Sequence, residues 1–268
     1  MARVELLGGR AGNFSTYVIA GGESPVSPTP DEAPIPPVVL FSDDSPLRRL
    51  PNALHRRQAL ALDGISFSVD MTLLSYRHLR AALWAQSKSA GQPTYRAVVL
   101  QAVTNAWAIV DNVHRLGVLV YKLPGLKRGP AVTALRKATD QVEPLRHAVQ
   151  HLDGEIEALL TDGRPLWGSL SWVNWDSPEN RLIGVSLLVP GALARHQHAP
   201  VVNPLGREVE IPIGLATLTA AGVTVCLSEV VAAVERFSGR LERAAAAGFA
   251  AIPVGASDFA VRLDLPVD

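Results

Sequence analysis

The 268-residue sequence has few of the features found in exported or membrane-bound proteins. It has one cysteine, Cys226, so no disulfide can form within the chain, and we expect a reducing, cytoplasmic location. Its longest apolar runs, such as 98–100 and 118–121, fall far short of the roughly 20 residues that a membrane-spanning helix needs. The first residues lack the apolar core of a signal peptide. These absences predict a cytoplasmic protein without a membrane partner.

The short motifs that bind nucleotide cofactors or build hydrolase sites are also missing. No GxGxxG, P-loop, HExxH or GxSxG pattern occurs, so we expect no cofactor. Aromatic residues make up 6% of the chain and charged residues 19%, whereas hydrophobic residues make up 48%. This composition supplies enough apolar material for a folded core and argues against wholesale disorder.

The net charge of zero conceals a basic segment. Between Ser45 and Thr139 there are fourteen basic residues and only three acidic ones, and the following stretch, 140–162, is acidic apart from Arg146. A basic block of this kind attracts polyanions, because phosphate contacts dominate affinity for nucleic acids. Alternatively, its cations lie on solvated helix faces and pair with acids elsewhere in the fold. The composition alone leaves both interpretations open.

The hydropathy pattern and the turn residues predict an α+β protein in three parts. A β-rich N-terminal segment with a proline-rich connection occupies 1–45, with strands expected at 4–7, 14–20 and 38–41. A central all-helical bundle occupies 46–162, and a small α+β domain occupies 163–268.

Within the central part, apolar periodicity and proline and glycine positions set the expected elements. The first is a helix at 47–62, which Gly64 is expected to stop. A short strand at 65–69 and helices at 73–89, 93–123 and 130–162 follow. The helix at 93–123 is apolar around its whole circumference, which is typical of a helix in the middle of a bundle. Pro144 is expected to kink or divide the last helix.

The C-terminal part alternates in the manner of β-strands. A hairpin is expected from strands 167–175 and 182–189, followed by strands at 209–213, 223–227 and 259–265. Ser228 is expected to cap a helix that runs to Ala247.

One helix concentrates polar residues that can carry chemistry. In the segment Arg146-His147-x-x-x-His151, the two histidines lie one turn apart on the same side, with Arg146 beside them. Glu143 and Glu155 extend that row at four-residue spacing, and Asp111 and His114 share a face of the apolar helix at 93–123. Burying such groups without partners costs about 1–3 kcal/mol each, so the cluster needs an explanation.

The spacing of Arg146 and His151, with a polar residue directly after the arginine, resembles the Arg-x4–6-His motif of the HEPN superfamily. The similarity is limited to the helical centre, about 47–160, and the chain departs from the His-x-Tyr continuation of many active members, having His151-Leu152-Asp153. The resemblance implies a HEPN-like helical bundle, a metal-independent endoribonuclease of a toxin or defence system, and a site built across a homodimer. It implies that His151 acts as general acid or base, that Arg146 holds the phosphate and that His147 assists.

If the ligand is RNA, the basic residues nearest to the motif would steer it. They are Arg115, Lys122, Lys127, Arg128, Arg136 and Lys137.

Two other interpretations of the same residues stay open. His147 and His151 have a suitable spacing for two imidazoles on one metal ion, which Asp111 and His114 could complete, although Arg146 would repel the cation. Alternatively, the row is a hydrogen-bonded polar seam between helices, in which histidines pair with Asp111 or the glutamates. The protein would then be a non-catalytic binding or scaffold module with a protein partner.

Overall fold

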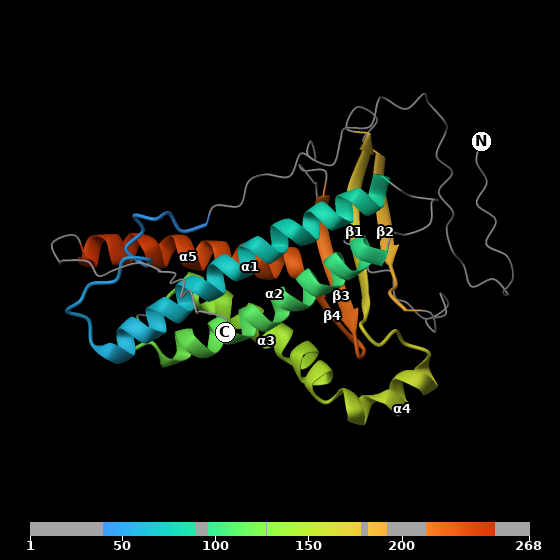
Figure 1. Ribbon diagram of the computed structural model, residues 1–268, viewed down its shortest axis with the longest axis horizontal. Coiled ribbons are helices and arrows are strands. Elements are labelled where there is room, and N and C mark those ends of the chain that lie inside the picture. The colour runs from blue at the N-terminus through green and yellow to red at the C-terminus, as the bar shows by residue number, and fades with distance from the viewer. Residues whose placement is uncertain (1–39, 89–95, 127, 178–181, 192–212, 250–268) are drawn as a thin grey trace, which may run out of the picture. The chain divides into compact units, whose positions relative to one another are not determined.

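The computed structural model describes residues 40–88, 96–126, 128–177, 182–191 and 213–249, which form an α+β fold of helices and one antiparallel sheet (Figure 1). The helices are α1 (Arg56–Lys88), α2 (Arg96–Lys122), α3 (Pro130–Gln150), α4 (Leu152–Asp162) and α5 (Leu227–Phe249). The strands are β1 (Ser169–Ser177), β2 (Leu182–Leu188), β3 (Ile213–Ala220) and β4 (Val223–Cys226). The strands expected at 4–7, 14–20 and 259–265 lie outside the described residues.

The core of the helical part is the long pairing of α1 with α2. Their facing sides bury Ile65, Leu79 and Leu83 from α1 and Ile109 and Leu116 from α2, each with at most 1% of its surface exposed. The long helix expected at 93–123 is therefore confirmed as α2, whose inner side is buried.

The structure corrects the elements predicted before residue 70. Residues 65–69 are helical and belong to α1, and Gly64 lies inside that helix against Leu119. The alternation of apolar residues with serine in 65–69 resembles the pattern of a strand. Ser66, however, donates a hydrogen bond to the carbonyl of Asp63, so its buried hydroxyl has a partner within the helix. The helix expected from Leu47 begins only at Arg56, after a stretch of turns, and Leu40 and Phe41 do not form a strand.

Helices α3 and α4 divide at His151 rather than at Pro144. Pro144 lies inside α3, which continues regularly to Gln150, and the backbone leaves helical geometry at His151, where φ is −112° and ψ is 36°. Figure 1 shows α4 turned away from the line of α3. The division of the helix expected at 130–162 is thus confirmed, but its position was wrong by seven residues.

The four strands are arranged in the order β2-β1-β3-β4, and every neighbouring pair is antiparallel. The predicted hairpin is confirmed, with Leu170 opposite Leu188 in β1 and β2, and the strand expected at 223–227 is confirmed as β4. Of the strand expected at 209–213, residues 209–212 lie outside the described part, and Ile213 is the first residue of β3, which runs to Ala220 and whose residues after Ile213 were not predicted as a strand.

Side-chain hydrogen bonds of a tryptophan and a serine link the sheet to the helices. Trp172 of β1 is 1% exposed, and its indole Nε1 donates a hydrogen bond of 2.8 Å to Ser87 Oγ of α1. Ser228, expected as a helix cap, instead lies in the first turn of α5, where its Oγ accepts hydrogen bonds from Tyr76 Oη and from the backbone N–H of Ala216, both at 2.8 Å. One hydroxyl therefore joins α1, β3 and α5.

Helix α5 packs against α1, α2 and α3, so it shares the core of the helical centre although it follows the sheet in sequence. Its buried side includes Val230, Val234, Phe237 and Leu241. Among the described residues, no helix is both long enough and apolar enough to cross a membrane.

Candidate active site

The predicted cluster is assembled where α2 and α3 run antiparallel to each other. Asp111 of α2 lies between two arginines: its Oδ1 is 3.3 Å from Arg146 Nε of α3, and its Oδ2 is 2.5 Å from Arg115 Nη2, one turn along α2. Arg146 also donates a hydrogen bond of 3.1 Å from Nη1 to Gln150 Oε1. Two of the three guanidinium nitrogens of Arg146 are therefore held, which fixes the plane of the group.

A close helix contact sets the register of this pair. At Gly117 of α2, an added Cβ would lie 2.6 Å from Thr139 Oγ1 of α3, so only glycine permits this approach. Gly117 is six residues after Asp111 and Thr139 is seven residues before Arg146, which is the spacing of two contacts along one antiparallel helix pair. The small residue thus brings Arg146 within reach of Asp111.

His147 and His151 lie at the end of α3 and are both exposed. Their ring centroids are 4.9 Å apart, and the ring planes meet at 75°, edge to face. The backbone N–H of His151 still donates to the carbonyl of His147 at 3.1 Å, so the last turn of α3 holds the two rings together although His151 itself is no longer helical. Both imidazoles are accessible to a substrate from solvent.

His114 occupies a different environment on α2. Its Nδ1 is buried and has no hydrogen-bond partner within the described structure. Burial lowers the pKa of His114, and the positive charge of Arg146 lowers this pKa further, whereas Glu143 and Asp111 act in the opposite direction. His114 is therefore held in its neutral form beside Arg146.

The acidic row expected at four-residue spacing is only partly assembled. Glu143 is exposed on α3 and close enough to influence His114, whereas the side chain of Glu155 lies outside the described part of the structure. Because the helix breaks at His151, the row does not continue on one helix into α4. Where side chains are described, no group of three or more His, Cys, Asp or Glu residues is placed to hold a metal ion.

The basic residues predicted to contact RNA are distributed over several surfaces. Arg115 is exposed and paired with Asp111, Lys122 lies over the ring of Tyr121 at 5.6 Å, and Arg128 and Arg136 are exposed. Lys127 lies outside the described residues.

Two of these basic residues, although neighbours in sequence, differ in their position around α3. Arg136 precedes His147 by eleven residues, which at about 100° per residue places them on nearly the same side of the helix. Lys137 precedes Arg146 by nine residues, which by the same geometry of about 100° per residue places it on the opposite side. Arg136 and His147 thus share a surface, whereas Lys137 belongs to another.

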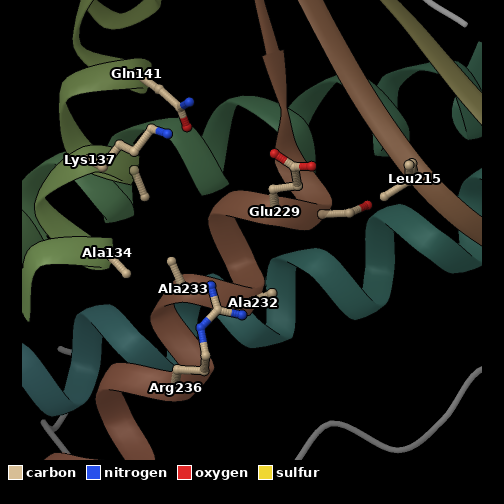
Figure 2. A pocket seen from close by; sticks show the side chains of 10 residues that line it. Ala134, Lys137, Gln141, Leu215, Glu229, Ala232, Ala233 and Arg236 are labelled. Atoms are coloured by element: carbon tan, nitrogen blue, oxygen red, sulfur yellow. The ribbon is translucent and has the colours of Figure 1, made fainter. Parts of the chain in front are cut away.

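The surface to which Lys137 belongs was not predicted. It lines a cavity of about 450 Å³ between α3 and α5, together with Glu229 and Arg236 of α5 (Figure 2). The alanines in both helices are the sequence feature that could have indicated this cavity, because small side chains leave room between the helices. The pairing of two helices so distant in sequence could not be inferred from these alanines.

Comparison of the chain with protein-family models, curated proteins and solved structures gives no significant match. The candidate site therefore rests on its own geometry.

Proposed function

We propose that the protein is a HEPN-like, metal-independent endoribonuclease that acts through Arg146 and His151, with His147 assisting. The observation that carries the proposal is the pair of exposed imidazoles, 4.9 Å apart, beside an arginine that Asp111 and Gln150 hold in place. Histidine is the side chain that can both accept and donate a proton near neutral pH, and an oriented guanidinium is well suited to a phosphate.

The chemistry requires only groups of this kind. His151 takes the proton from a ribose 2′-hydroxyl, whose oxygen then forms a bond to the adjacent phosphorus while the bond from phosphorus to the 5′-oxygen breaks. The departing 5′-oxygen takes up a proton from an imidazolium, either His147 or His151 after its own protonation. The products are a 2′,3′-cyclic phosphate and a 5′-hydroxyl, and no metal or cofactor enters the balance.

Arg146 would stabilise the charge that develops on the phosphate oxygens. Its Nε and Nη1 are engaged, whereas Nη2 makes no hydrogen bond to any described residue, so a donor is left for the substrate. Neutral His114 adds no charge that would compete with Arg146 for the phosphate. Arg136 lies on the same side of α3 as His147 and would guide RNA towards the histidines.

The proposal includes a homodimer as the working assembly and a cytoplasmic location, both of which follow from the resemblance and the composition rather than from the geometry.

The test is cleavage of RNA by purified protein in the presence of EDTA. We expect His151→Gln and Arg146→Gln each to lower the rate by about 10²–10⁴-fold, with the 2′,3′-cyclic phosphate as the product end. The matched control is His78→Gln, since His78 is an exposed histidine on α1, whereas the cluster is carried by α2 and α3. A set of single-stranded and structured RNAs that the folded protein leaves intact would refute the proposal, as would activity that persists in His151→Gln.

A second function is favoured by the ion pair itself. Arg146 and Asp111 link α3 to α2, and their side chains are 28% and 37% exposed, so the pair can serve as a seam in a non-catalytic scaffold that binds a protein partner. Asp111→Asn distinguishes the two functions. In a nuclease it lowers the cleavage rate because Arg146 loses its orientation, whereas in a scaffold it changes only the stability, by about 0.2–1 kcal/mol as for other partly exposed pairs.

A further inference from the structure

Two tryptophans that are partly exposed lie beside the candidate active site. Trp107 is on α2, four residues before Asp111, so at about 100° per residue the two side chains lie on the same side of the helix, one turn apart. The indole Nε1 of Trp107 donates a hydrogen bond of 3.2 Å to the backbone carbonyl of Trp167, which lies between α4 and β1. This bond joins residues 60 positions apart and brings the second tryptophan to the first.

The α2–α3 register places the tryptophan pair at the histidine end of the site. Asp111 is paired with Arg146, and the two helices run antiparallel. A step of one turn, about 5 Å, towards the start of α2 leads from Asp111 to Trp107. The same step of one turn towards the end of α3 leads from Arg146 to Gln150, which directly precedes His151. The tryptophan pair and the two histidines therefore lie on the same side of the Asp111–Arg146 ion pair.

The backbone that carries Trp167 is held in place by its surroundings. Gly168 donates a backbone hydrogen bond of 3.0 Å to the carbonyl of Pro165, which closes a four-residue turn with Trp167 at its third position. Gly168 has a φ of 73°, and a Cβ there would lie 2.5 Å from the carbonyl oxygen of Thr219 in β3, so this position requires glycine. The hydrogen bond from Trp107 holds the same turn from α2. Trp167 itself is 46% exposed, so a fixed backbone presents a large aromatic ring to solvent.

We infer that Trp167 stacks on a base of the substrate, that Trp107 is its positioning residue, and that the substrate is single-stranded RNA. An indole ring offers a flat face on which any of the four bases can stack. Bases in a duplex are already stacked on their neighbours, whereas the bases of a single strand can be turned onto an aromatic side chain. The inference rests on the proposed function for the position of the scissile phosphate, which is beside Arg146.

The tryptophans and the cations would recognise different parts of the strand. Arg146 and Arg136 act on phosphates, so their contribution to affinity falls as the salt concentration rises and counterions compete. Stacking on Trp167 involves no charge and releases no counterion, so its contribution should stay nearly constant with salt. The two kinds of contact can therefore be separated by measuring affinity at several salt concentrations.

The test is the binding of a fluorescein-labelled 2′-O-methyl decaadenylate to the full chain, measured by fluorescence anisotropy. This strand lacks the free 2′-hydroxyl that attacks the phosphate, so binding is measured without cleavage. We expect Trp167→Leu to weaken binding by about 5–150-fold, as the loss of one base stack implies, with the salt dependence unchanged. Trp167→Phe keeps an aromatic ring and should retain most of the affinity. Trp107→Phe removes the N–H that holds the turn and should weaken binding by less than Trp167→Leu.

Phe67→Leu is the matched control for the loss of an aromatic ring. Phe67 is 48% exposed on α1, so its ring is about as accessible as that of Trp167 but is carried by a different helix from the site. This substitution should leave binding unchanged. Arg136→Gln is the control for charge, because Arg136 is exposed on α3 and its loss should lower both the affinity and its dependence on salt.

Three results would overturn the inference. They are the absence of binding of the 2′-O-methyl strand to the folded wild-type protein, binding by Trp167→Leu that equals that of the wild type, and a duplex of the same length that binds as tightly as the single strand. Failure of the proposed function gives a different result. A protein that binds the strand through Trp167 but cuts no RNA retains the stacking site and is not a nuclease, whereas one that cuts RNA equally well with leucine at position 167 is a nuclease without this stacking site.

Discussion

Substitution of Gly117 with alanine should destabilise the protein, although alanine is the better helix former. In isolation this substitution in a helix gains about 1 kcal/mol. At Gly117, however, the new methyl group would lie 2.6 Å from Thr139 Oγ1, well inside contact distance, and overpacking of this kind costs about 1–3 kcal/mol. The free energy of unfolding should therefore fall by up to about 2 kcal/mol.

Gly239 in α5 provides the matched control. A Cβ there would meet only the flexible end of Arg243, at 3.5 Å, so Gly239→Ala should raise the free energy of unfolding by up to about 1 kcal/mol. Urea titration followed by circular dichroism measures both, and the m-values should stay equal. Thr139→Ala should restore part of the loss in Gly117→Ala, with a coupling energy of about 0.5–3 kcal/mol, because it removes the atoms that collide.

The outcome bears on the site as well as on stability. If Gly117→Ala stabilised the protein as much as Gly239→Ala, α2 and α3 would not be in close contact at Thr139, and the register that pairs Asp111 with Arg146 would be wrong.

Two further predictions concern single side chains. Because burial lowers the pKa of His114 below its ordinary value of 6.5, the unfolded chain binds more protons there, so the free energy of unfolding should fall as the pH is lowered through about 6.5. His114→Gln should reduce this dependence on pH in urea titrations, and an unchanged dependence in His114→Gln would contradict the role given to His114. Ser228→Ala should lower the free energy of unfolding by about 1–3 kcal/mol, because Tyr76 and the Ala216 N–H both lose their acceptor. Ser75→Ala on α1 serves as a control, because the half-buried Ser75 hydroxyl forms no hydrogen bond to any described residue, and an equal loss in both variants would refute the linking role of Ser228.

Much of the α+β architecture could be predicted from local pattern. The β1–β2 hairpin follows from two alternating runs around a turn-rich stretch, and α2 follows from an unbroken apolar pattern between prolines. The errors in predicted secondary structure occur in segments whose conformation is decided by the residues that pack against them in space. The alternating segment 65–69 is helical, with Phe67 exposed and its other residues buried, and the hydroxyl of Ser66 donates a hydrogen bond to the carbonyl of Asp63 in the same helix.

The candidate site could be predicted as a set of residues but not as an arrangement. Periodicity alone placed His147 and His151 on one side of a helix, and their rings are indeed adjacent. That Arg146 would contact Asp111 required knowledge of the α2–α3 register, which depends on the contact of Gly117 with Thr139. The break at His151, which removes Glu155 from the row, is marked by no helix-breaking residue in the sequence at that position.

The junction at Ser228 has a consequence for the speed of folding. The hydrogen bond from Tyr76 to Ser228 joins residues 152 positions apart, and the one from Trp172 to Ser87 joins residues 85 positions apart. Such contacts require the closure of long loops, whose entropic cost grows with length and which slows folding relative to proteins rich in local contacts. The hairpin of α1 and α2 can form early, whereas the docking of the sheet and α5 must wait until α5, the last of the described elements, has been synthesised.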